Sequence, residues 1–128
     1  MSKVLVDSAA WIDYFAGKKN TSGLDALIEE NLICVNDLIL AELLPSIRLQ
    51  KAFELASMLK AIEKIPLTID WDEIIEMQVL NQKHGINKVG LPDLIIVQNV
   101  IKNNLELCSP DHHFRLMREL FGFKLISL

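Results

Sequence analysis

Four short apolar segments recur along the chain, separated by longer stretches of mixed polarity. They are Val4–Val6, Ile33–Val35, Leu105–Cys108 and Lys124–Ile126. Apolar runs this short, without alternating polar positions, are typical of strands that are buried on both faces of a parallel sheet. We therefore predict four such strands in one sheet with helices on both sides.

Apolar residues spaced three or four positions apart fill the gaps between these strands and predict helices. The first helix is capped by Ser8 and turns Trp11, Ile12 and Phe15 inward, and a short helix runs from residue 21 or 22 to 30. A helix over 38–44 is capped by Asp37 and ends near Pro45, and a further helix covers 49–62. The next covers 70–85, where Asp70 and Glu73 resemble a capping box, and is followed by one over 91–103. The last helix is opened by Ser109 and Pro110 and ends near Gly122. This order predicts a single three-layer α/β/α domain over residues 1–128, with a mostly parallel central sheet.

Composition supports one folded domain and limits the kinds of partner. The chain has 128 residues, of which 51% are hydrophobic and 23% charged, so disorder is excluded. Its 13 basic and 17 acidic residues give a net charge of −4, which argues against binding nucleic acid through overall charge. A local basic strip around an acidic, metal-filled site remains compatible with that charge. So many apolar residues in a short chain also predict a homodimer through apolar helix surface.

The cysteines and the apolar runs indicate the compartment. Cys34 and Cys108 lie far apart in apolar segments without any Cys-x-x-Cys spacing, so both are expected to be free thiols. Asp7 interrupts the apolar stretch that a signal peptide would need. Every apolar run is shorter than the ~20 residues of a membrane span. We expect a cytoplasmic protein with no membrane association.

Four acidic residues stand out by position. Asp7 and Asp111 each follow a predicted strand, Glu42 is the one ionisable residue in an apolar helix, and Asp93 lies in the first turn of another. Each has an ordinary alternative: a turn or cap for Asp7, a surface position for Glu42, and a favourable helix-dipole position for Asp93 and Asp111. Because the carboxyl ends of strands in such sheets form the ligand crevice, we expect the four carboxylates to converge there.

Convergent carboxylates repel one another unless a cation joins them. Sites built only from oxygen ligands suit Mg²⁺ or Mn²⁺. Such metals orient a water, lower its pKa and stabilise charge on a phosphoryl group. The glycine-rich phosphate loops and the Gly-x-Ser-x-Gly nucleophile motif are absent from the sequence. His112 and His113 are adjacent on a helix and are expected to form a surface pair rather than a metal site.

Four segments together resemble PIN-domain proteins of the VapC toxin type. Val4–Phe15 resembles the opening of these proteins, Leu40–Leu44 their second acidic motif and Pro92–Ile96 their third. Cys108–Phe114 resembles their T-x-D-x-x-F ending, with Ser109 in place of Thr. All four segments occur in the order of the family.

The resemblance implies a parallel sheet between helices and a divalent-metal-dependent ribonuclease. It also implies a homodimer and inhibition by an antitoxin partner of the VapB type. Asp7, Glu42, Asp93 and Asp111 match the acidic site and its metal ligands, and Ser8 and Ser109 match the hydroxyl positions beside it. The chain departs from the family at Gln98 and Asn99, where small alanines are usual.

The mechanism that this resemblance implies is in-line attack on an RNA phosphodiester. Asp7 and Asp93 would be the main ligands of Mg²⁺ or Mn²⁺, Glu42 would bind metal or orient the water, and Asp111 would help to place a second metal or its water shell. The candidate RNA contacts are Lys18, Lys19, Arg48, Lys51, Lys83, Lys88 and Arg115. An antitoxin is expected to place a basic side chain over Asp7 and Asp93 and to cover apolar surface near Trp11 and Phe15.

Two alternatives remain open at this point. One is a catalytically inactive PIN-like module that works through protein contacts. The other is an α/β enzyme that uses Asp7 as a nucleophile, as aspartyl-phosphate phosphatases do. Those enzymes have a second aspartate two residues later, where this chain has Ala9.

Overall fold

A five-stranded parallel sheet forms the centre of the protein. The structure, a computed structural model, describes residues 2–18, 21 and 23–126. The strand order is β3-β2-β1-β4-β5, and all neighbouring strands are parallel. The strands are β1 (Val4–Val6), β2 (Ile33–Val35), β3 (Glu63–Lys64), β4 (Glu106–Cys108) and β5 (Lys124–Ile126). The predicted parallel sheet is confirmed, with one strand more than expected.

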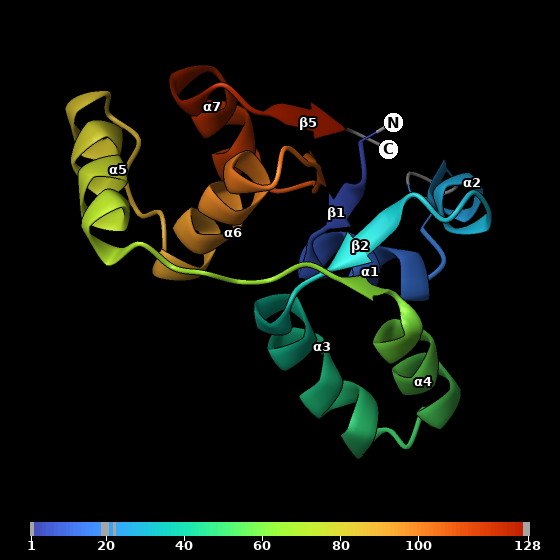
Figure 1. Ribbon diagram of the computed structural model, residues 1–128. Coiled ribbons are helices and arrows are strands. Elements are labelled where there is room, and N and C mark those ends of the chain that lie inside the picture. Colours follow the sequence, from blue (N-terminus) through green and yellow to red (C-terminus); the bar gives the residue numbers. More distant parts are fainter. Residues whose placement is uncertain (1, 19–20, 22, 127–128) are drawn as a thin grey trace.

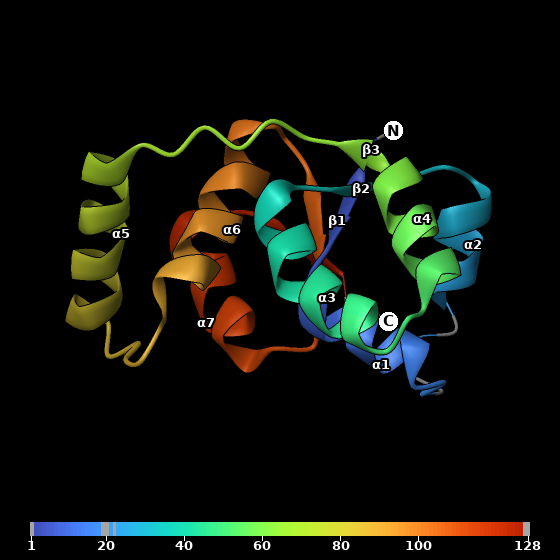
Figure 2. The ribbon, with the colours of Figure 1, turned by 90° about the horizontal axis from the view of Figure 1, so that it is seen from below.

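Helices cover both faces of this sheet. They are α1 (Ser8–Phe15), α2 (Gly23–Glu29), α3 (Asp37–Leu49), α4 (Phe53–Ala61), α5 (Trp71–Lys83), α6 (Leu91–Lys102) and α7 (His112–Phe121). The chain first moves outward from β1 to β3 and then returns to β4 and β5. Right-handed crossovers therefore place α1–α4 on one face and α5–α7 on the other, as Figures 1 and 2 show. The α/β fold class is confirmed.

The middle strands are buried on both faces, as their composition predicts. Every residue of β1 and β2 is buried, and the largest fully buried side chains around the sheet include Trp11 and Phe114. Cys34 and Cys108 are free and lie on the two strands that flank β1. Two strand spacings of ~4.8 Å separate them, beyond the ~7 Å Cα separation that a disulfide tolerates.

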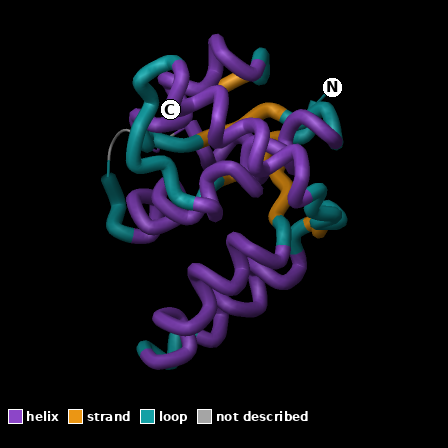
Figure 3. Tube along the Cα trace, turned by 90° about the vertical axis from the view of Figure 1, so that its left-hand side faces the viewer, coloured by secondary structure: helices purple, strands orange, loops and turns teal. Residues whose placement is uncertain are grey.

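The structure corrects the expected end of the third helix. α3 continues through Pro45 to Leu49 instead of ending near Pro45. Pro45 removes the hydrogen bond to the carbonyl of Ala41, but both residues are exposed, so water can satisfy that carbonyl. Leu43 and Ile47 meanwhile keep the helix packed on the core. In Figure 3 the α3–α4 pair extends below the sheet layers.

The predicted helix over 49–62 is confirmed from Phe53 to Ala61 as α4, but its start is wrong, because a turn precedes it. α3 ends at Leu49, Lys51 adopts a left-handed φ of 56°, and α4 begins at Phe53. The same stretch leads into β3, whose two charged, exposed residues pair with β2 at the sheet edge. An edge strand this short and polar carries no hydrophobic pattern that could reveal it.

Several helix ends differ from the expected caps. Asp70 caps α5 and Gly122 ends α7 with a left-handed φ of 73°, both as predicted. Asp111, rather than Ser109, is the N-cap of α7, and Asn36, rather than Asp37, caps α3. The cap expected at Ser22 lies outside the described residues.

The expected inward face of the first helix is partly wrong. Trp11 is fully buried, but Ile12 is 58% exposed. Helix α1 is therefore packed by the face that carries Ala10 and Trp11, and it presents Ile12 outward. In the part of the chain that the structure describes, every helix is too short or too polar to cross a membrane.

Buried amides fasten the segment between β3 and α5 to α6. The Gln98 amide oxygen accepts from the backbone N–H of Asp70 at 3.1 Å, and its nitrogen donates to the Asp70 carbonyl at 3.1 Å and to Glu73 Oε1 at 2.6 Å. Asn99 Nδ2 donates to the Pro66 carbonyl at 2.9 Å, and its Oδ1 accepts from Asn36 Nδ2 at 2.9 Å. These bonds explain why Gln98 and Asn99 stand where the resembling family has alanines.

We expect Asn99→Ala to destabilise the fold by about 2 kcal/mol, because the substitution leaves Asn36 Nδ2 and the Pro66 carbonyl without partners. Urea unfolding followed by circular dichroism measures this free energy. Asn87→Ala is the matched control, since Asn87 is exposed and its amide makes one 3.4 Å bond to a loop carbonyl. Equal stability of the two variants would contradict a structural role for the buried amide.

Candidate metal centre

Asp7 stands at the point where the sheet order reverses. Its backbone N–H bonds to the Cys108 carbonyl at 3.0 Å, which extends the β1–β4 pairing to the crevice. Asp7 is also the N-cap of α1, yet its carboxylate makes no capping bond. Instead, Asp7 Oδ2 accepts a 3.0 Å hydrogen bond from the Ser109 hydroxyl. The carboxylate is buried and does not cap the helix, so a simple turn or cap role does not explain why an aspartate stands at position 7.

The pKa of Asp7 reflects this setting. Burial raises its pKa most, and the negative charge of Asp111 raises it further. Hydrogen bonds from Ser109 and Ser8 lower the pKa. Both hydroxyl residues named from the sequence therefore act on the Asp7 carboxylate.

Glu42 lies on an exposed part of α3, contrary to the expectation that little polar face exists there. Ala41, Glu42, Pro45 and Ser46 are all exposed, and the buried side of the helix is narrower than its apolar composition predicts. The pKa of Glu42 is raised, first by partial burial and then by the charge of Asp7, whereas a hydrogen bond from Ser8 lowers it. Glu42 thus lies close enough to Asp7 for their charges to interact.

Asp93 occupies the first turn of α6, as the sequence predicts. Its pKa is raised to about 6, mostly by burial and also by the charges of Asp111, Asp7 and Glu42, whereas His113 acts to lower it. All three other carboxylates therefore act on Asp93. The structure brings the four acids from α1, α3, α6 and α7 into one electrostatic cluster.

Asp111 joins this cluster through the start of α7. Its Oδ1 accepts from the His113 backbone N–H at 2.9 Å and so caps the helix. The Asp111 N–H donates to the Ser109 hydroxyl oxygen at 3.2 Å, and that hydroxyl in turn donates to Asp7. Ser109 therefore fixes Asp7 and Asp111 relative to each other across the crevice.

His113 also belongs to the cluster, which the sequence analysis missed. Its Nδ1 lies 3.8 Å from Asp93 Oδ2 and 3.7 Å from Asp111 Oδ1. The side chain of His112 is 72% exposed, as expected of a surface residue, whereas that of His113 is 21% exposed. Recognising Asp111 as the helix cap would have placed His113 in the first turn, beside the capping carboxylate.

No lysine or arginine of the described segments forms an ion pair with any of the four acids. The ion pairs of basic side chains with carboxylates are Lys3–Glu63, Lys18–Asp13 and Lys64–Asp37, all elsewhere. Among the described residues, only histidines lie within ion-pair distance of these acids, so negative charge accumulates there. Oxygen atoms in such an arrangement fit a divalent cation, and ligand atoms of Asp93, Asp111 and His113 lie within 4.8 Å of one another.

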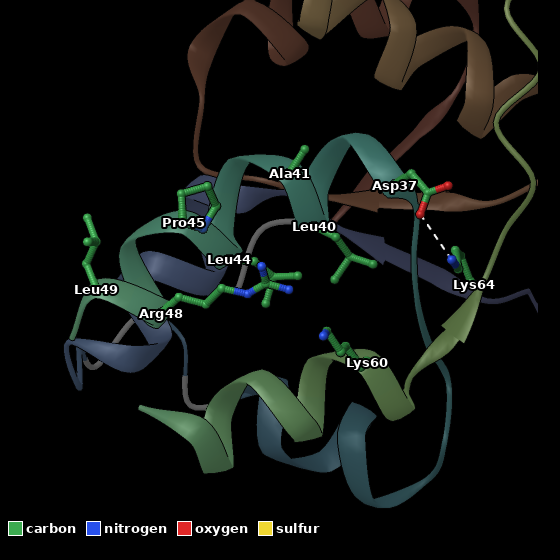
Figure 4. A pocket seen from close by; sticks show the side chains of 9 residues that line it. All are labelled: Asp37, Leu40, Ala41, Leu44, Pro45, Arg48, Leu49, Lys60 and Lys64. Atoms are coloured by element: carbon green, nitrogen blue, oxygen red, sulfur yellow. Dashed lines mark ion pairs between the residues drawn. The ribbon is translucent and has the colours of Figure 1, made fainter. Parts of the chain in front are cut away.

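Two hollows lie on either side of α3. The larger, of about 980 Å³, separates α3 from α4 and is lined by Leu40 and Leu44, with Arg48, Lys60 and Lys64 at its rim (Figure 4). The smaller, of about 380 Å³, is lined by Ile12, Phe15, Glu42, Leu43 and Leu55, among others. Only the smaller groove reaches an acid of the cluster.

The chain matches the PIN domain family over residues 4–120. Its fold resembles a chain of VapBC2 from Rickettsia felis bound to a promoter DNA fragment, with a TM-score of 0.75, 17% identity and 98% of each chain covered. It also resembles a chain of FitAcB from Neisseria gonorrhoeae, with a TM-score of 0.71, 15% identity and 97% and 96% covered. For DNA-bound VapBC from Salmonella typhimurium the TM-score is 0.65, with 18% identity and 98% of each chain covered. No curated protein matches the chain significantly.

These likenesses confirm the fold that the sequence resemblance implies. The family match begins in β1 and ends in α7, and the residues of the acidic cluster all fall inside it. The chain belongs to the PIN domain family.

Proposed function

We propose that this protein is a divalent-metal-dependent endoribonuclease and the toxin of a toxin–antitoxin pair. The observation that carries the proposal is the cluster of Asp7, Glu42, Asp93 and Asp111, whose charges act on one another without a lysine or arginine ion-pair partner among the described residues. Membership of the PIN domain family and the similarity to chains of toxin–antitoxin complexes support it.

The cluster has the ligands that such a metal requires. Asp7 and Asp93 are the proposed main ligands, and Glu42 and Asp111 contribute from the two sides of the crevice. When bound, Mg²⁺ or Mn²⁺ would lower the pKa of a coordinated water and stabilise negative charge on a phosphoryl group. Because the pKa of Asp93 is about 6, its carboxylate is mostly ionised at neutral pH, as a cation ligand must be.

The side chains of the chain then position the reacting groups. Ser109 holds the Asp7 carboxylate through a 3.0 Å hydrogen bond, and Ser8 lies close enough to Asp7 and Glu42 to lower the pKa of both. Glu42 is open to solvent and accepts a hydrogen bond from the water that attacks the phosphorus in line with the departing oxygen. The hydroxyls therefore keep both carboxylates in fixed orientation while RNA enters.

Basic side chains outside the cluster would bind the RNA backbone. Arg48 lies with Lys60 and Lys64 at the rim of the larger hollow, where three cations face a single acid, Asp37. Lys18 is paired with Asp13 at 3.1 Å, which makes it a weaker candidate for an RNA contact. Of the other candidates, Lys51, Lys83, Lys88 and Arg115 are exposed, and Lys19 lies outside the described residues.

The smaller groove beside Glu42 suits an antitoxin of the VapB type. Ile12 and Phe15 give it an apolar wall, and Glu42 connects it to the acidic cluster. A partner segment lying there would cover apolar surface and place an arginine over Asp7 and Asp93, where a bidentate bond to carboxylate forms. Trp11 takes no part, because it is fully buried.

A homodimer is part of the proposal, and α5 offers a surface for it. Trp71, Ile75 and Val79 are spaced four residues apart on one helix face and are 55%, 59% and 40% exposed. An apolar stripe of this kind is a common feature of protein interfaces. The same stripe would also suit an inactive interaction module. Measurements of RNA cleavage and of metal binding therefore have to distinguish the nuclease from that alternative.

We expect Asp93→Asn to reduce RNA cleavage at least about a hundredfold, because one charged group of the reacting site is lost. Mn²⁺ should raise the melting temperature of the wild type and not that of Asp93→Asn, since binding stabilises only a folded site. Asp72→Asn, which changes an exposed acid in the first turn of α5, is the matched control. A wild type that neither cleaves RNA nor gains stability from Mn²⁺ would favour the inactive module.

The stability of the metal-free protein should depend on Asp93 and pH. Its pKa rises from 3.8 to about 6 on folding, so the ionised carboxylate destabilises the fold. This destabilisation is absent below about pH 4, grows as the pH rises from about 4 to about 6, and is complete above about pH 6. In EDTA, Asp93→Asn should therefore melt a few degrees above the wild type at pH 7.5 and close to it at pH 4.

Melting curves recorded by circular dichroism across this pH range test the prediction. The control Asp72→Asn should show no difference from the wild type that changes with pH. A constant difference between Asp93→Asn and the wild type at all pH values would show that ionisation of Asp93 is not its cause.

Binding of a candidate antitoxin should depend on the same carboxylates. The double variant Asp7→Asn/Asp93→Asn should bind at least about tenfold more weakly in a calorimetric titration, because the partner's basic side chain loses its acceptors. Added Mn²⁺ should weaken binding to the wild type. Ile12→Ser tests the groove separately, since Ile12 is exposed and its loss should not affect folding. Unchanged affinity in all three cases would place the partner elsewhere.

A further inference from the structure

We propose that His113 is a direct ligand of the cation, so that the centre combines one imidazole nitrogen with carboxylate oxygens. This inference rests on the proposed metal site and adds to it a residue and a metal preference. The geometry of three side chains at the junction of α6 and α7 carries it, namely Asp93, Asp111 and His113.

The distances leave space for an ion between these side chains. His113 Nδ1 is 3.8 Å from Asp93 Oδ2 and 3.7 Å from Asp111 Oδ1. Both separations exceed a hydrogen bond, which joins such atoms at ~2.7–2.9 Å. A metal with ligand bonds of ~2.1 Å can touch two atoms separated by up to about 4.2 Å. One ion can therefore bridge the nitrogen and either carboxylate, and ligand atoms of all three residues lie within 4.8 Å of one another.

The backbone holds the ring in this position. The His113 N–H donates to Asp111 Oδ1 at 2.9 Å, which fixes the first turn of α7 against the capping carboxylate. The next residue, Phe114, is fully buried and anchors that turn in the core. His113 is thus placed by the same cap that places Asp111.

His112 provides an internal comparison. Its ring lies 4.4 Å from that of His113, centroid to centroid, and its Nδ1 is also 3.7 Å from Asp111 Oδ1. The two histidines differ in their relation to Asp93, because only His113 forms a compact set of ligand atoms with both acids among the described residues. A general attraction of histidine to Asp111 would involve both rings, whereas metal ligation involves His113 alone.

An imidazole ligand changes which metal the centre prefers. Oxygen-only sites suit Mg²⁺, and a nitrogen ligand increases the relative affinity for transition metals such as Mn²⁺. With His113 as a ligand, the wild type should prefer Mn²⁺ to Mg²⁺ more strongly than a variant that lacks the ring.

Pulsed electron paramagnetic resonance of the Mn²⁺-loaded protein tests the ligand directly. A coordinated imidazole nitrogen couples to the unpaired electrons of Mn²⁺ and modulates the echo decay. We expect this ¹⁴N modulation in the wild type and in His112→Gln, and its loss in His113→Gln. The chain has three histidines, so the double variant His84→Gln/His112→Gln retains His113 alone and should keep the modulation. This double variant decides the question even where His113→Gln fails to fold.

Metal titrations supply a second readout without RNA. His113→Gln should bind Mn²⁺ at least about tenfold more weakly, while its Mg²⁺ affinity changes less. Bound Mn²⁺ without ¹⁴N modulation, or modulation that persists in His113→Gln, would overturn the role of His113 and leave the carboxylate site intact. Absence of bound Mn²⁺ in the wild type would overturn the metal site itself and this inference with it.

Discussion

Mutual repulsion of the carboxylates at the β1–β4 boundary is the constraint on which the rest of the site depends. Burial raises the pKa of Asp93 most, and the charges of Asp111, Asp7 and Glu42 all raise it further. The fold offsets part of this cost with neutral dipoles, because Ser109 donates to Asp7 and the start of α7 donates to Asp111. The remaining negative charge is what suits the cluster to the proposed cation.

Buried amides connect the helices that carry these acids. Asn36 caps α3 with its side-chain oxygen and donates to Asn99, which lies on α6 and also holds the Pro66 carbonyl. Glu42 lies six residues after Asn36, and Asp93 lies six residues before Asn99. One hydrogen-bonded pair in the core therefore ties together two helices that come from opposite faces of the sheet. Alanine at position 99 could not make this link.

The sequence predicts those features that depend on local pattern. Strands β1 and β2 follow from their unbroken apolar runs, and Asp7 and Asp111 follow from their places after strands. Features set by distant neighbours were missed: α3 passes Pro45 because that face meets solvent, and β3 exists because β2 offers an open edge. The exposure of Glu42 was also missed, because it too depends on how α3 packs against distant parts of the chain. His113 was overlooked because its partner Asp93 is twenty residues away in the chain and because Ser109, rather than Asp111, was expected to cap the helix.

The reversal of strand order divides the acidic cluster between two parts of the chain. Asp7 and Glu42 precede β3, whereas Asp93, Asp111 and His113 follow it. A nascent chain that has emerged from the ribosome only as far as α5 carries two of these groups, held by an incomplete sheet that lacks β4. The cluster is assembled only after residue 113 has been translated and β4 has inserted beside β1. The chemistry proposed for the cluster therefore cannot begin before that point in synthesis.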